Sequence, residues 1–370
     1  MSAQMRVAVT GAHGFLGWHL SCRLLATRGI EPVRLGRADL GDPQALRVGL
    51  EDVDTVLHVA GVNRAESDED VERGNVELAR TLAVALGDRP VHVVYADSVQ
   101  VDEDNAYGRG KRRAAEILGE RPGTFADVVL PNLFGEHGRP AYNSFVATFC
   151  HEVAAGREPS VHEDRLVPLL HVQSAAESLI LEAERRQRHA TRPQGEPRAV
   201  VEVLQMLQGF HEQYAVRGEV PDVSTPFSRD LFNTYRSHLF PDAYPIHPEP
   251  HADQRGILVE AVRAHGGTGQ TFVSTTVPGA LRGDHYHLRK IERFMVVRGD
   301  AEISLRRLYH DDVVRFRVSG GSPGFVDMPT MWAHSIRNVG DDDLVTVFWA
   351  DQLLDPEHPD QYPQKVEERP

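Results

Sequence analysis

Met5-Arg-Val-Ala-Val-Thr-Gly11-Ala-His-Gly14-Phe-Leu-Gly17 stands near the start of the chain. Its apolar, β-branched first half predicts a buried strand, and leucines at helical spacing in residues 18–28 predict a helix after the glycines. Strand, glycine turn and helix in this order are the context of a dinucleotide-binding fingerprint. Gly11 permits the tight turn, Gly14 lets the backbone approach a pyrophosphate at the helix N-terminus, and Gly17 permits close helix packing. We therefore predict that the chain begins with an α/β Rossmann-type domain.

The second predicted strand, Pro32–Leu35, ends in Gly36-Arg37. A carboxylate at the end of this strand binds the ribose hydroxyls of NAD, whereas an arginine there suits the 2′-phosphate of NADP. The alternative is that Arg37 is a solvated loop arginine without a ligand. We favour the first interpretation, so NADPH is the expected cofactor.

A tyrosine and a lysine follow at helical spacing in Tyr107-Gly-Arg-Gly-Lys111. Residues i and i+4 share one face of a helix, so the ammonium lies near the phenol. A nearby cation lowers the pKa of a tyrosine from its usual value of about 10, which lets Tyr107 exchange a proton with a substrate oxygen during hydride transfer. Ser98, at the end of the preceding strand, can hold the same oxygen. The alternative is a solvated helix start with an incidental lysine, but the glycine fingerprint favours Ser98, Tyr107 and Lys111 as catalytic residues.

A second stretch with chemical character is Gly283-Asp-His-Tyr-His-Leu-Arg-Lys-Ile-Glu-Arg-Phe-Met-Val-Val-Arg-Gly299. On a strand, His285 and His287 point to the same face, and Glu292 can return on the next strand. Together with His334 they form a plausible shell for a divalent metal. The chain has 19 histidines, so a chance His-x-His is the alternative. The spaced glutamate and the later histidine argue against chance. Lys290 or a tyrosine is a candidate proton carrier, and the sequence leaves that choice open.

The composition of the whole chain limits the classes of function. The chain has 370 residues, which suggests two or three domains, and its 41% hydrophobic share is ordinary for a globular protein. A net charge of −14 argues against nucleic acid as the main partner. The two cysteines, Cys22 and Cys150, lie in apolar helical segments and are expected to be buried free thiols. No signal peptide or membrane-spanning run is recognisable, so we expect a soluble, cytoplasmic protein with no membrane partner.

The character of the chain changes around residues 240–253, which are rich in proline and polar residues and typical of a semi-rigid linker. Beyond them, short predicted strands alternate with Gly, Asp or Pro turns, a pattern typical of a β-barrel or sandwich. These strands are expected at residues 257–262, 270–277, 294–297, 301–308, 313–318, 324–328 and 344–349. We therefore expect a reductase domain at 1–243, a linker at 244–253 and an all-β domain at 254–370.

These motifs carry a resemblance to known families. The glycine spacing and the Ser–Tyr–Lys set resemble the extended short-chain dehydrogenase/reductase family, and the two histidine clusters resemble the cupin family of metal-binding β-barrels. Both domains in this order resemble the CapF family of bifunctional capsular polysaccharide synthesis enzymes. The resemblance implies cofactor contacts at Gly11, Gly14, Phe15, Leu16, Gly17, Arg37, Asp39, Leu40, Ala60, Gly61, Lys111 and Pro131. It implies nucleotide-sugar contacts at Asn63, Arg64, Asn132, Asn143 and Arg165, and metal ligands at His285, His287, Glu292 and His334.

The activity implied by the CapF resemblance is bifunctional. In that family the zinc-binding cupin domain epimerises C3 of a UDP-4-keto-6-deoxy-N-acetylhexosamine. The reductase domain then reduces C4 with NADPH to UDP-N-acetyl-6-deoxy-L-talosamine, a precursor of N-acetyl-L-fucosamine in capsule polysaccharide. The resemblance also implies a homodimer. One alternative is a monofunctional NADPH-dependent 4-ketoreductase of a UDP- or dTDP-deoxysugar with a structural cupin domain. A non-enzymatic nucleotide sensor or scaffold is another, which the intact Ser–Tyr–Lys set argues against.

Overall fold

The computed structural model describes residues 5–368. Packing divides the chain into two compact units, the first comprising Met1–Phe134 and Arg165–Arg198 and the second comprising Gly135–Asp164 and Ala199–Pro370. Compactness thus groups the helical segments before the barrel with the barrel itself. The expected division at residues 243 and 254 follows family modules rather than packing, and it stays a prediction.

The first unit is built on a parallel sheet with the strand order β2-β1-β3-β4-β5-β8. Its strands are short and consist largely of buried apolar residues, as expected when helices cover both faces of a parallel sheet. The Rossmann-type architecture predicted from the glycine turn is therefore confirmed. The strands are β1 Val7–Thr10, β2 Val33–Leu35, β3 Thr55–His58, β4 His92–Ser98, β5 Phe125–Leu130 and β8 His189–Thr191.

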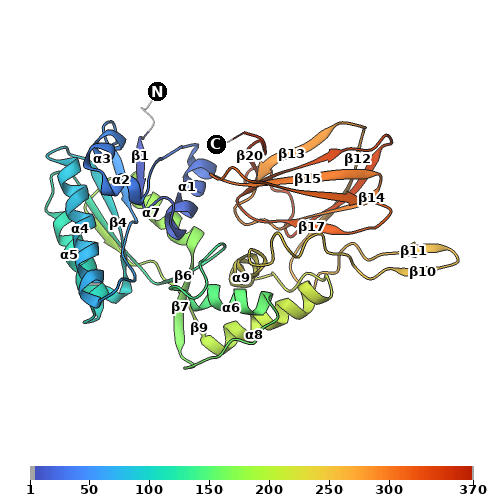
Figure 1. Cartoon of the computed structure of the whole chain (residues 1–370), viewed down its shortest axis with the longest axis horizontal. Helices are drawn as coiled ribbons and strands as arrows, with labels where there is room; N and C mark the ends of the chain where they lie inside the picture. The colour runs from blue at the N-terminus through green and yellow to red at the C-terminus, as the bar shows by residue number, and fades with distance from the viewer. Residues whose placement is uncertain (1–4, 369–370) are drawn as a thin grey trace. The chain divides into compact units, whose positions relative to one another are not determined.

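Helices cover the two faces of this sheet in separate groups (Figure 1). On one face, α1 (Phe15–Arg28) and α7 (Val172–Arg185) bury leucine, isoleucine and alanine side chains against the strands. On the other face, α3 (Pro43–Gly49), α4 (Asp68–Leu86) and α5 (Ala106–Gly119) do the same. Smaller elements complete the unit: the short helices α2 Arg37–Gly41 and η1 Val99–Asp102, and a three-stranded sheet of β6 Asn132–Phe134, β7 Leu166–His171 and β9 Glu196–Ala199.

The second unit ends in an all-β domain made of two antiparallel sheets, so the predicted barrel-type C-terminal fold is confirmed. One sheet has the order β12-β19-β14-β17 and the other has the order β16-β15-β18-β13-β20. Their strands are β12 Gln270–Thr276, β13 Leu281–Tyr286, β14 Glu292–Arg298, β15 Asp300–Arg307, β16 Val313–Ser319, β17 Phe325–Met328, β18 Trp332–Asn338, β19 Leu344–Ala350 and β20 Tyr362–Pro363. Strand β18 was not among the expected strands, because its mixture of polar and aromatic residues obscures the alternation of polar and apolar side chains that predicts a strand.

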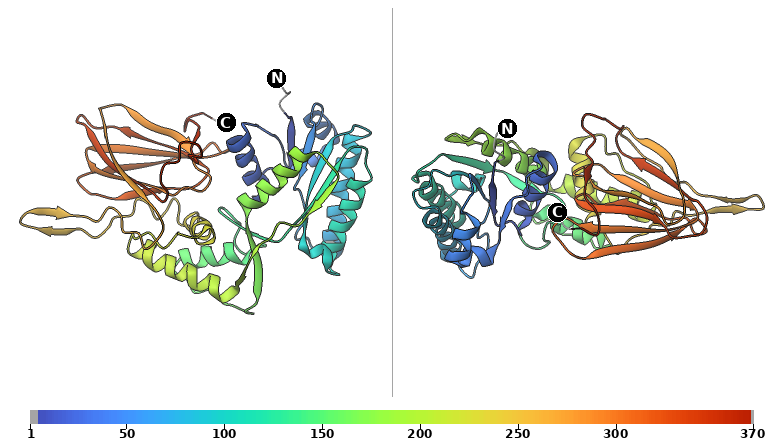
Figure 2. Two further views of the ribbon diagram at one scale, coloured as in Figure 1. Left: turned by 180° about the vertical axis from the view of Figure 1, so that it is seen from behind. Right: turned by 90° about the horizontal axis from the view of Figure 1, so that it is seen from above.

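Before this domain, the strand expected at residues 257–262 is only partly present. β11 covers Gly256–Leu258 and pairs with β10, His251–Asp253. The resulting hairpin is exposed along its length and projects from the unit in both views of Figure 2. The preceding segment is tied to the barrel, since Tyr244 is buried and Ile246 pairs with Phe325.

Buried polar contacts attach the helices of the second unit to its barrel. Arg293 and Asp327 form a fully buried two-point ion pair at 2.8 and 3.0 Å, and the hydroxyl of Tyr214 donates to the same carboxylate at 2.7 Å. Asn233 donates to the carbonyl of Arg289 at 2.8 Å. Tyr214 lies in the π-helical turn η2 (His211–Val216) and Asn233 in α9 (Pro226–Arg236). These contacts explain why α9 and η2, with the neighbouring α8 (Val200–Phe210) and α6 (Phe145–Ala154), belong to the barrel's unit.

Both cysteines are buried, and neither forms a disulfide, as expected. In residues 5–368, no helix combines the length and apolar composition needed to cross a bilayer.

Candidate functional site

The glycine turn after β1 has the close contacts that its spacing predicts. Gly11 has φ +68°, a conformation that favours glycine. Its carbonyl oxygen accepts the N–H of Gly14 at 2.9 Å, which closes the turn. A Cβ at Gly17 would lie 2.2 Å from the carbonyl oxygen of Gly11, so no other residue fits there without displacing the turn. Helix α1 begins at Phe15 with no side-chain cap, so its first N–H groups are available to an anion. The turn therefore fits a dinucleotide pyrophosphate.

The end of β2 has no acidic side chain that could hold a ribose. Its last position before α2 is Gly36, and a Cβ there would lie 2.5 Å from Nδ1 of His13, whose ring occupies that space. Arg37 follows and is exposed at the first turn of α2. Asp39, expected to contact adenine, accepts the N–H of Gly36 at 2.7 Å and so caps α2. The basic and imidazole groups around this corner fit a phosphate better than a diol.

The loop after β3 carries Ala60 and Gly61, expected at the cofactor, and Asn63 and Arg64, expected at the substrate. Its anchor is Asn75 of α4, which is buried and holds Val62 from both sides. The side-chain oxygen of Asn75 accepts the N–H of Val62 at 3.1 Å, and its nitrogen donates to the Val62 carbonyl at 2.7 Å. Asn75 was not among the predicted site residues, because its partner Val62 precedes it by 13 positions, outside its own helix.

The predicted catalytic residues come from two neighbouring elements. Ser98 is the last residue of β4, and Tyr107 and Lys111 lie one turn apart at the start of α5. Asn105 caps this helix by accepting the N–H of Gly108 at 2.7 Å, which sets the helix start immediately before Tyr107. A Cβ at Gly108 would lie 2.1 Å from the carbonyl oxygen of Gln100 in η1, so this glycine lets α5 lie against the short helix that follows β4.

Lys111 is one of only three lysines in the chain, with Lys290 and Lys365. It is buried, and its Nζ donates to the carbonyl of Ala96 at 2.6 Å and lies 4.0 Å from the centre of the Tyr95 ring. Burial lowers the pKa of Lys111 to about 8, and the carboxylates of Asp97 and Asp127 oppose this shift. A lysine in this state is still mostly a cation at neutral pH.

The remaining expected substrate and cofactor residues are distributed over both units. Asn63, Arg64, Asn132 and Arg165 are exposed and belong to the first unit, and Asn143 is exposed and belongs to the second. Pro131, expected beside the cofactor, is buried between β5 and β6. Their roles toward a ligand stay predictions.

In the second unit the four expected metal ligands converge. One ligand atom from each of His285, His287, Glu292 and His334 can be chosen so that all lie within 4.8 Å of one another. Nε2 of His287, His334 and His285 lies 3.1, 3.3 and 3.6 Å from the same carboxylate oxygen of Glu292. His285 on β13 is paired with His334 on β18 in one sheet, and Glu292 begins β14 in the other, so the two sheets share the site.

The hydrogen bonds of the imidazoles test whether this cluster fits a metal ion. Nδ1 of His287 lies 2.6 Å from the carbonyl oxygen of Asp360, and Nδ1 of His334 lies 3.0 Å from that of Trp332. A carbonyl oxygen can only accept a hydrogen bond, so Nδ1 of each ring must carry the proton. In a neutral ring Nε2 then has a lone pair, and this lone pair faces Glu292. Nε2 of His285 is buried and has no hydrogen-bond partner among residues 5–368. Lone pairs facing a carboxylate repel one another unless a cation lies among them, so the donor set fits a divalent metal.

The protonation states agree with this fit. Burial lowers the pKa of His334 to about 4, so its imidazole is neutral at pH 7. Burial by itself would raise the pKa of Glu292, but the adjacent histidines hold that pKa well below its usual range. Neutral imidazoles and an ionised carboxylate are the forms that bind a metal.

Asp360, from the segment before β20, organises this site from outside and was not predicted. Its two carboxylate oxygens accept the N–H groups of Leu288, Arg289 and Lys290 at 3.0, 2.9 and 2.7 Å. Its carbonyl also orients His287. The loop that it holds presents buried Lys290, whose Nζ lies 3.8 Å from the second oxygen of Glu292. Asp360 lies 68 positions beyond Glu292 in the chain, and no spacing rule links them.

Removing a bound metal should destabilise the barrel. A ligand present at about a thousand times its dissociation constant stabilises a fold by roughly 4 kcal/mol. Protein reconstituted with Zn²⁺ and then treated with a chelator should therefore melt roughly 10 °C lower in calorimetry. The variant Glu292→Gln should show little difference between the two treatments. Equal melting temperatures for treated and reconstituted wild-type protein would contradict the metal site.

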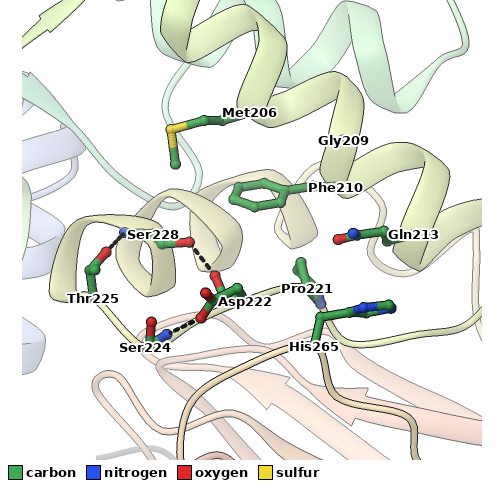
Figure 3. Close-up of a pocket in the computed structure, with 10 residues that line it drawn as sticks. All are labelled: Met206, Gly209, Phe210, Gln213, Pro221, Asp222, Ser224, Thr225, Ser228 and His265. Atoms are coloured by element: carbon green, nitrogen blue, oxygen red, sulfur yellow. Dashed lines mark hydrogen bonds between the residues drawn. The ribbon is translucent and has the colours of Figure 1, made fainter.

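A separate cavity of about 300 Å³ lies in the second unit between α8, η2 and the start of α9 (Figure 3). Its polar groups serve the local backbone: Thr225 caps α9 by accepting the N–H of Ser228 at 3.1 Å, and Asp222 accepts the N–H of Ser224 at 2.9 Å. None of the predicted site residues lines it. The cavity thus offers no group that the expected chemistry requires.

The Rossmann sheet with its glycine turn defines the first unit as a nucleotide-cofactor enzyme fold. Residues 7–192 match the model of the NAD dependent epimerase/dehydratase family, and residues 251–362 match that of the polysaccharide biosynthesis C-terminal domain. The chain belongs to the NAD dependent epimerase/dehydratase family, which implies a nicotinamide cofactor.

Three relatives illustrate the similarity. A protein from Pseudomonas aeruginosa named UDP-2-acetamido-2,6-beta-L-arabino-hexul-4-ose reductase is 34% identical over 369 residues, covering 97% of this chain and 98% of the relative. The crystal structure of the capsular polysaccharide assembling protein CapF from Staphylococcus aureus is similar with a TM-score of 0.60 and 29% identity, over 98% of this chain and 100% of that one. The expected resemblance to CapF is therefore confirmed over the full length. UDP-N-acetylglucosamine 4-epimerase from Bacillus cereus shares the fold, with a TM-score of 0.51 and 20% identity over 56% of this chain and 82% of that one.

Proposed function

We propose that the chain is a bifunctional nucleotide-sugar enzyme. Its C-terminal barrel epimerises C3 of a UDP-4-keto-6-deoxy-N-acetylhexosamine, and its Rossmann domain then reduces the C4 ketone with NADPH to UDP-N-acetyl-6-deoxy-L-talosamine. The observation that carries this proposal is the converging set of three histidines and one glutamate in a chain that also holds Ser98, Tyr107 and Lys111. The names of the Pseudomonas aeruginosa reductase and of CapF support the same substrate class and a role in capsule or surface polysaccharide synthesis.

The order of the two steps follows from carbonyl chemistry. The proton at C3 is acidic only while C4 is a ketone, because the negative charge left by its removal spreads onto the carbonyl oxygen. Reduction at C4 ends that activation. Epimerisation must therefore precede reduction, and the keto sugar is the substrate of both sites.

In the reductase step each residue of the first unit has a defined task. Ser98 holds the C4 oxygen, and Tyr107 donates a proton to it as the ketone becomes an alcohol. The Lys111 ammonium stabilises the phenolate that Tyr107 becomes. The glycine turn would hold NADPH, which when bound would supply the hydride.

In the epimerase step a divalent ion, when bound, stabilises negative charge on the C4 oxygen. We propose zinc for this ion, since imidazole and carboxylate ligands suit it. His285, His287, Glu292 and His334 would hold it. The C3 proton requires a carrier. Buried Lys290, whose Nζ lies 3.8 Å from Glu292, is one candidate, and a tyrosine is the alternative. Asp360 keeps the loop of Lys290 in place through its three amide contacts.

Hydrogen exchange tests the bifunctional proposal against a reductase with a purely structural barrel. The protein is incubated with the UDP-linked 4-keto sugar in deuterated water without NADPH, and C3 is examined by NMR. Deuterium at C3 is the expected result. NADPH-dependent reduction without any exchange would leave the monofunctional 4-ketoreductase. A parallel series with the dTDP-linked sugar identifies the nucleotide.

We also propose a cytoplasmic homodimer, which light scattering of the full chain would test.

The cofactor preference can be tested at Arg37. Loss of one charge-assisted contact to a phosphate costs about 1.5–3 kcal/mol, so Arg37→Ala should raise KM for NADPH by roughly tenfold or more. KM for NADH should barely change, because NADH lacks the 2′-phosphate. Steady-state rates with both cofactors measure this difference, and Arg47→Ala on α3 is the control. Equal changes for both cofactors would argue for a structural role of Arg37.

A further inference from the structure

Two carboxylates that the reaction scheme does not use lie on the same face of the parallel sheet as Tyr95. Asp127 of β5 is the direct neighbour of Tyr95 in β4, and Asp97 lies two residues further along β4. Side chains at this spacing and register project from one face of a sheet. Tyr95 packs in the core that includes Ala114 and Leu118 of α5. Asp97 and Asp127 therefore face the helix that carries Tyr107 and Lys111.

Their surroundings are unusual for aspartates. Asp97 is buried and accepts the N–H of Ser98 at 2.8 Å. Oδ1 of Asp127 is buried without a hydrogen-bond partner among the described residues. The ammonium of Lys111 is bound to the carbonyl of Ala96, the residue directly before Asp97. Carboxylates on this sheet face favour the charged form of the buried ammonium, which would otherwise tend to lose its proton.

We propose that Asp97 and Asp127 are positioning residues that keep Lys111 protonated in its buried place, so that it can assist Tyr107. This inference rests on the proposed reductase function, because Lys111 needs its charge only if Tyr107 acts on a substrate oxygen. Asp97 has a second task in holding the backbone of Ser98. The pair thus connects the serine and the lysine of the candidate catalytic set.

The other ionisable groups around Lys111 do not replace this pair. From β3, His58 is buried and bonded to Thr10 at 2.7 Å, and burial followed by the charge of Lys111 lowers the pKa of His58 to about 3. From β4, burial raises the pKa of Tyr95 well above its usual range, so that its phenol is neutral. Arg192 is exposed and donates two hydrogen bonds to the carboxylate of Asp102 in η1, with lengths of 2.6 and 3.0 Å. Tyr107 is the proposed proton donor. Asp97 and Asp127 are thus the carboxylates that oppose the effect of burial on Lys111.

The expected dependence on pH has a definite sign. Burial lowers the pKa of Lys111 to about 8, so its charge is present below that pH and is lost as pH rises through it. Burial and the charge of Asp97 raise the pKa of Asp127 to about 7, so Asp127 is ionised in the range where Lys111 titrates. Removing either carboxylate charge should move the Lys111 midpoint to lower pH. Asp97→Asn and Asp127→Asn are suitable changes, because each removes the charge and keeps the size of the side chain. At position 97 an amide oxygen can still accept the N–H of Ser98.

The chain contains only three lysines, so lysine labelled with carbon-13 at Cε gives three signals that can be assigned by replacing each with arginine. The full-length protein without substrate is titrated by NMR between about pH 6 and about pH 10. The wild-type Lys111 midpoint should lie near 8. It should fall by roughly one pH unit in each single variant and further in the double variant. Asp104→Asn is the matched control. Asp104 is an exposed aspartate in the loop between η1 and α5, and it pairs with Arg109. An unmoved Lys111 midpoint in the folded double variant would overturn the inference.

A second measurement separates this inference from the proposed function. The turnover number for NADPH-dependent ketone reduction is recorded against pH for the wild type, the double variant and Asp104→Asn. The alkaline fall in the double variant should move in parallel with the Lys111 midpoint, lowering turnover at pH 8 by about tenfold. A shifted midpoint with an unshifted rate profile would also overturn the inference. Absence of ketone reduction in the wild type would overturn the reductase function itself.

Discussion

Tyr107→Phe is expected to lower the turnover number of NADPH-dependent ketone reduction by about a thousandfold. The change removes one oxygen atom, which is the proposed proton donor to the C4 oxygen. The ring remains, so α5 should keep its start at Ala106, its cap at Asn105 and the position of Lys111. Oxidation of NADPH followed by absorbance, with a 4-keto sugar nucleotide as substrate, measures the effect.

Two controls make this result specific. Tyr107→Phe should still bind NADPH with little change in fluorescence titration and should still exchange deuterium at C3, because we propose that this exchange takes place in the barrel. Arg109→Gln, an exposed position on the same helix turn, should reduce the ketone at close to the wild-type rate. Retention of more than about a tenth of the wild-type turnover by Tyr107→Phe would exclude the tyrosine as proton donor.

His285→Ala should abolish deuterium incorporation at C3 while leaving the Rossmann domain able to reduce a keto sugar that already has the product configuration at C3. His285 supplies one of the four converging candidate ligand atoms. The variant keeps only three of them, so it should bind the metal more weakly. Metal analysis of the purified variant should give well below one ion per chain. NMR of C3 in deuterated water measures the exchange.

His358→Ala is the matched control for this experiment, since His358 is an exposed histidine of the same domain that contacts Asp355. It should retain the metal and the exchange. Continued exchange in a His285→Ala variant that has lost its metal would show that the ion does not take part in epimerisation. The barrel would then use Lys290 or a tyrosine without it.

Most of the fold could be predicted from local pattern. The Rossmann sheet follows from apolar runs separated by glycine turns and helices, and the barrel follows from short strands between turn residues. Strand β18 escaped prediction because Trp332, His334, Ser335 and Arg337 break the alternation of polar and apolar residues. Local pattern also does not show which segments pack into one compact unit, since buried contacts such as the hydrogen bond of Tyr214 to Asp327 join positions 113 residues apart.

The sequence by itself determined the residues whose chemistry depends on short spacing. The glycine turn and the Tyr107–Lys111 pair are each encoded within one turn or helix, where the backbone geometry dictates which side chains face each other. The His285-x-His287 pair is almost as local, although His287 directly follows the end of β13 at Tyr286. His334 was found by type and family pattern, and its pairing with His285 across β13 and β18 agrees with that assignment.

Only the tertiary structure decided which groups support these residues. Asn75 holds the loop of Asn63 and Arg64, Asp360 orients His287, and Asp97 and Asp127 lie on the sheet face that α5, the helix of Lys111, covers. Each acts across strand pairing or loop closure, so its partner lies at no fixed distance along the chain. The physical reason is that hydrogen bonds and charge pairing between such groups arise only after burial has brought distant segments together and removed the competing water.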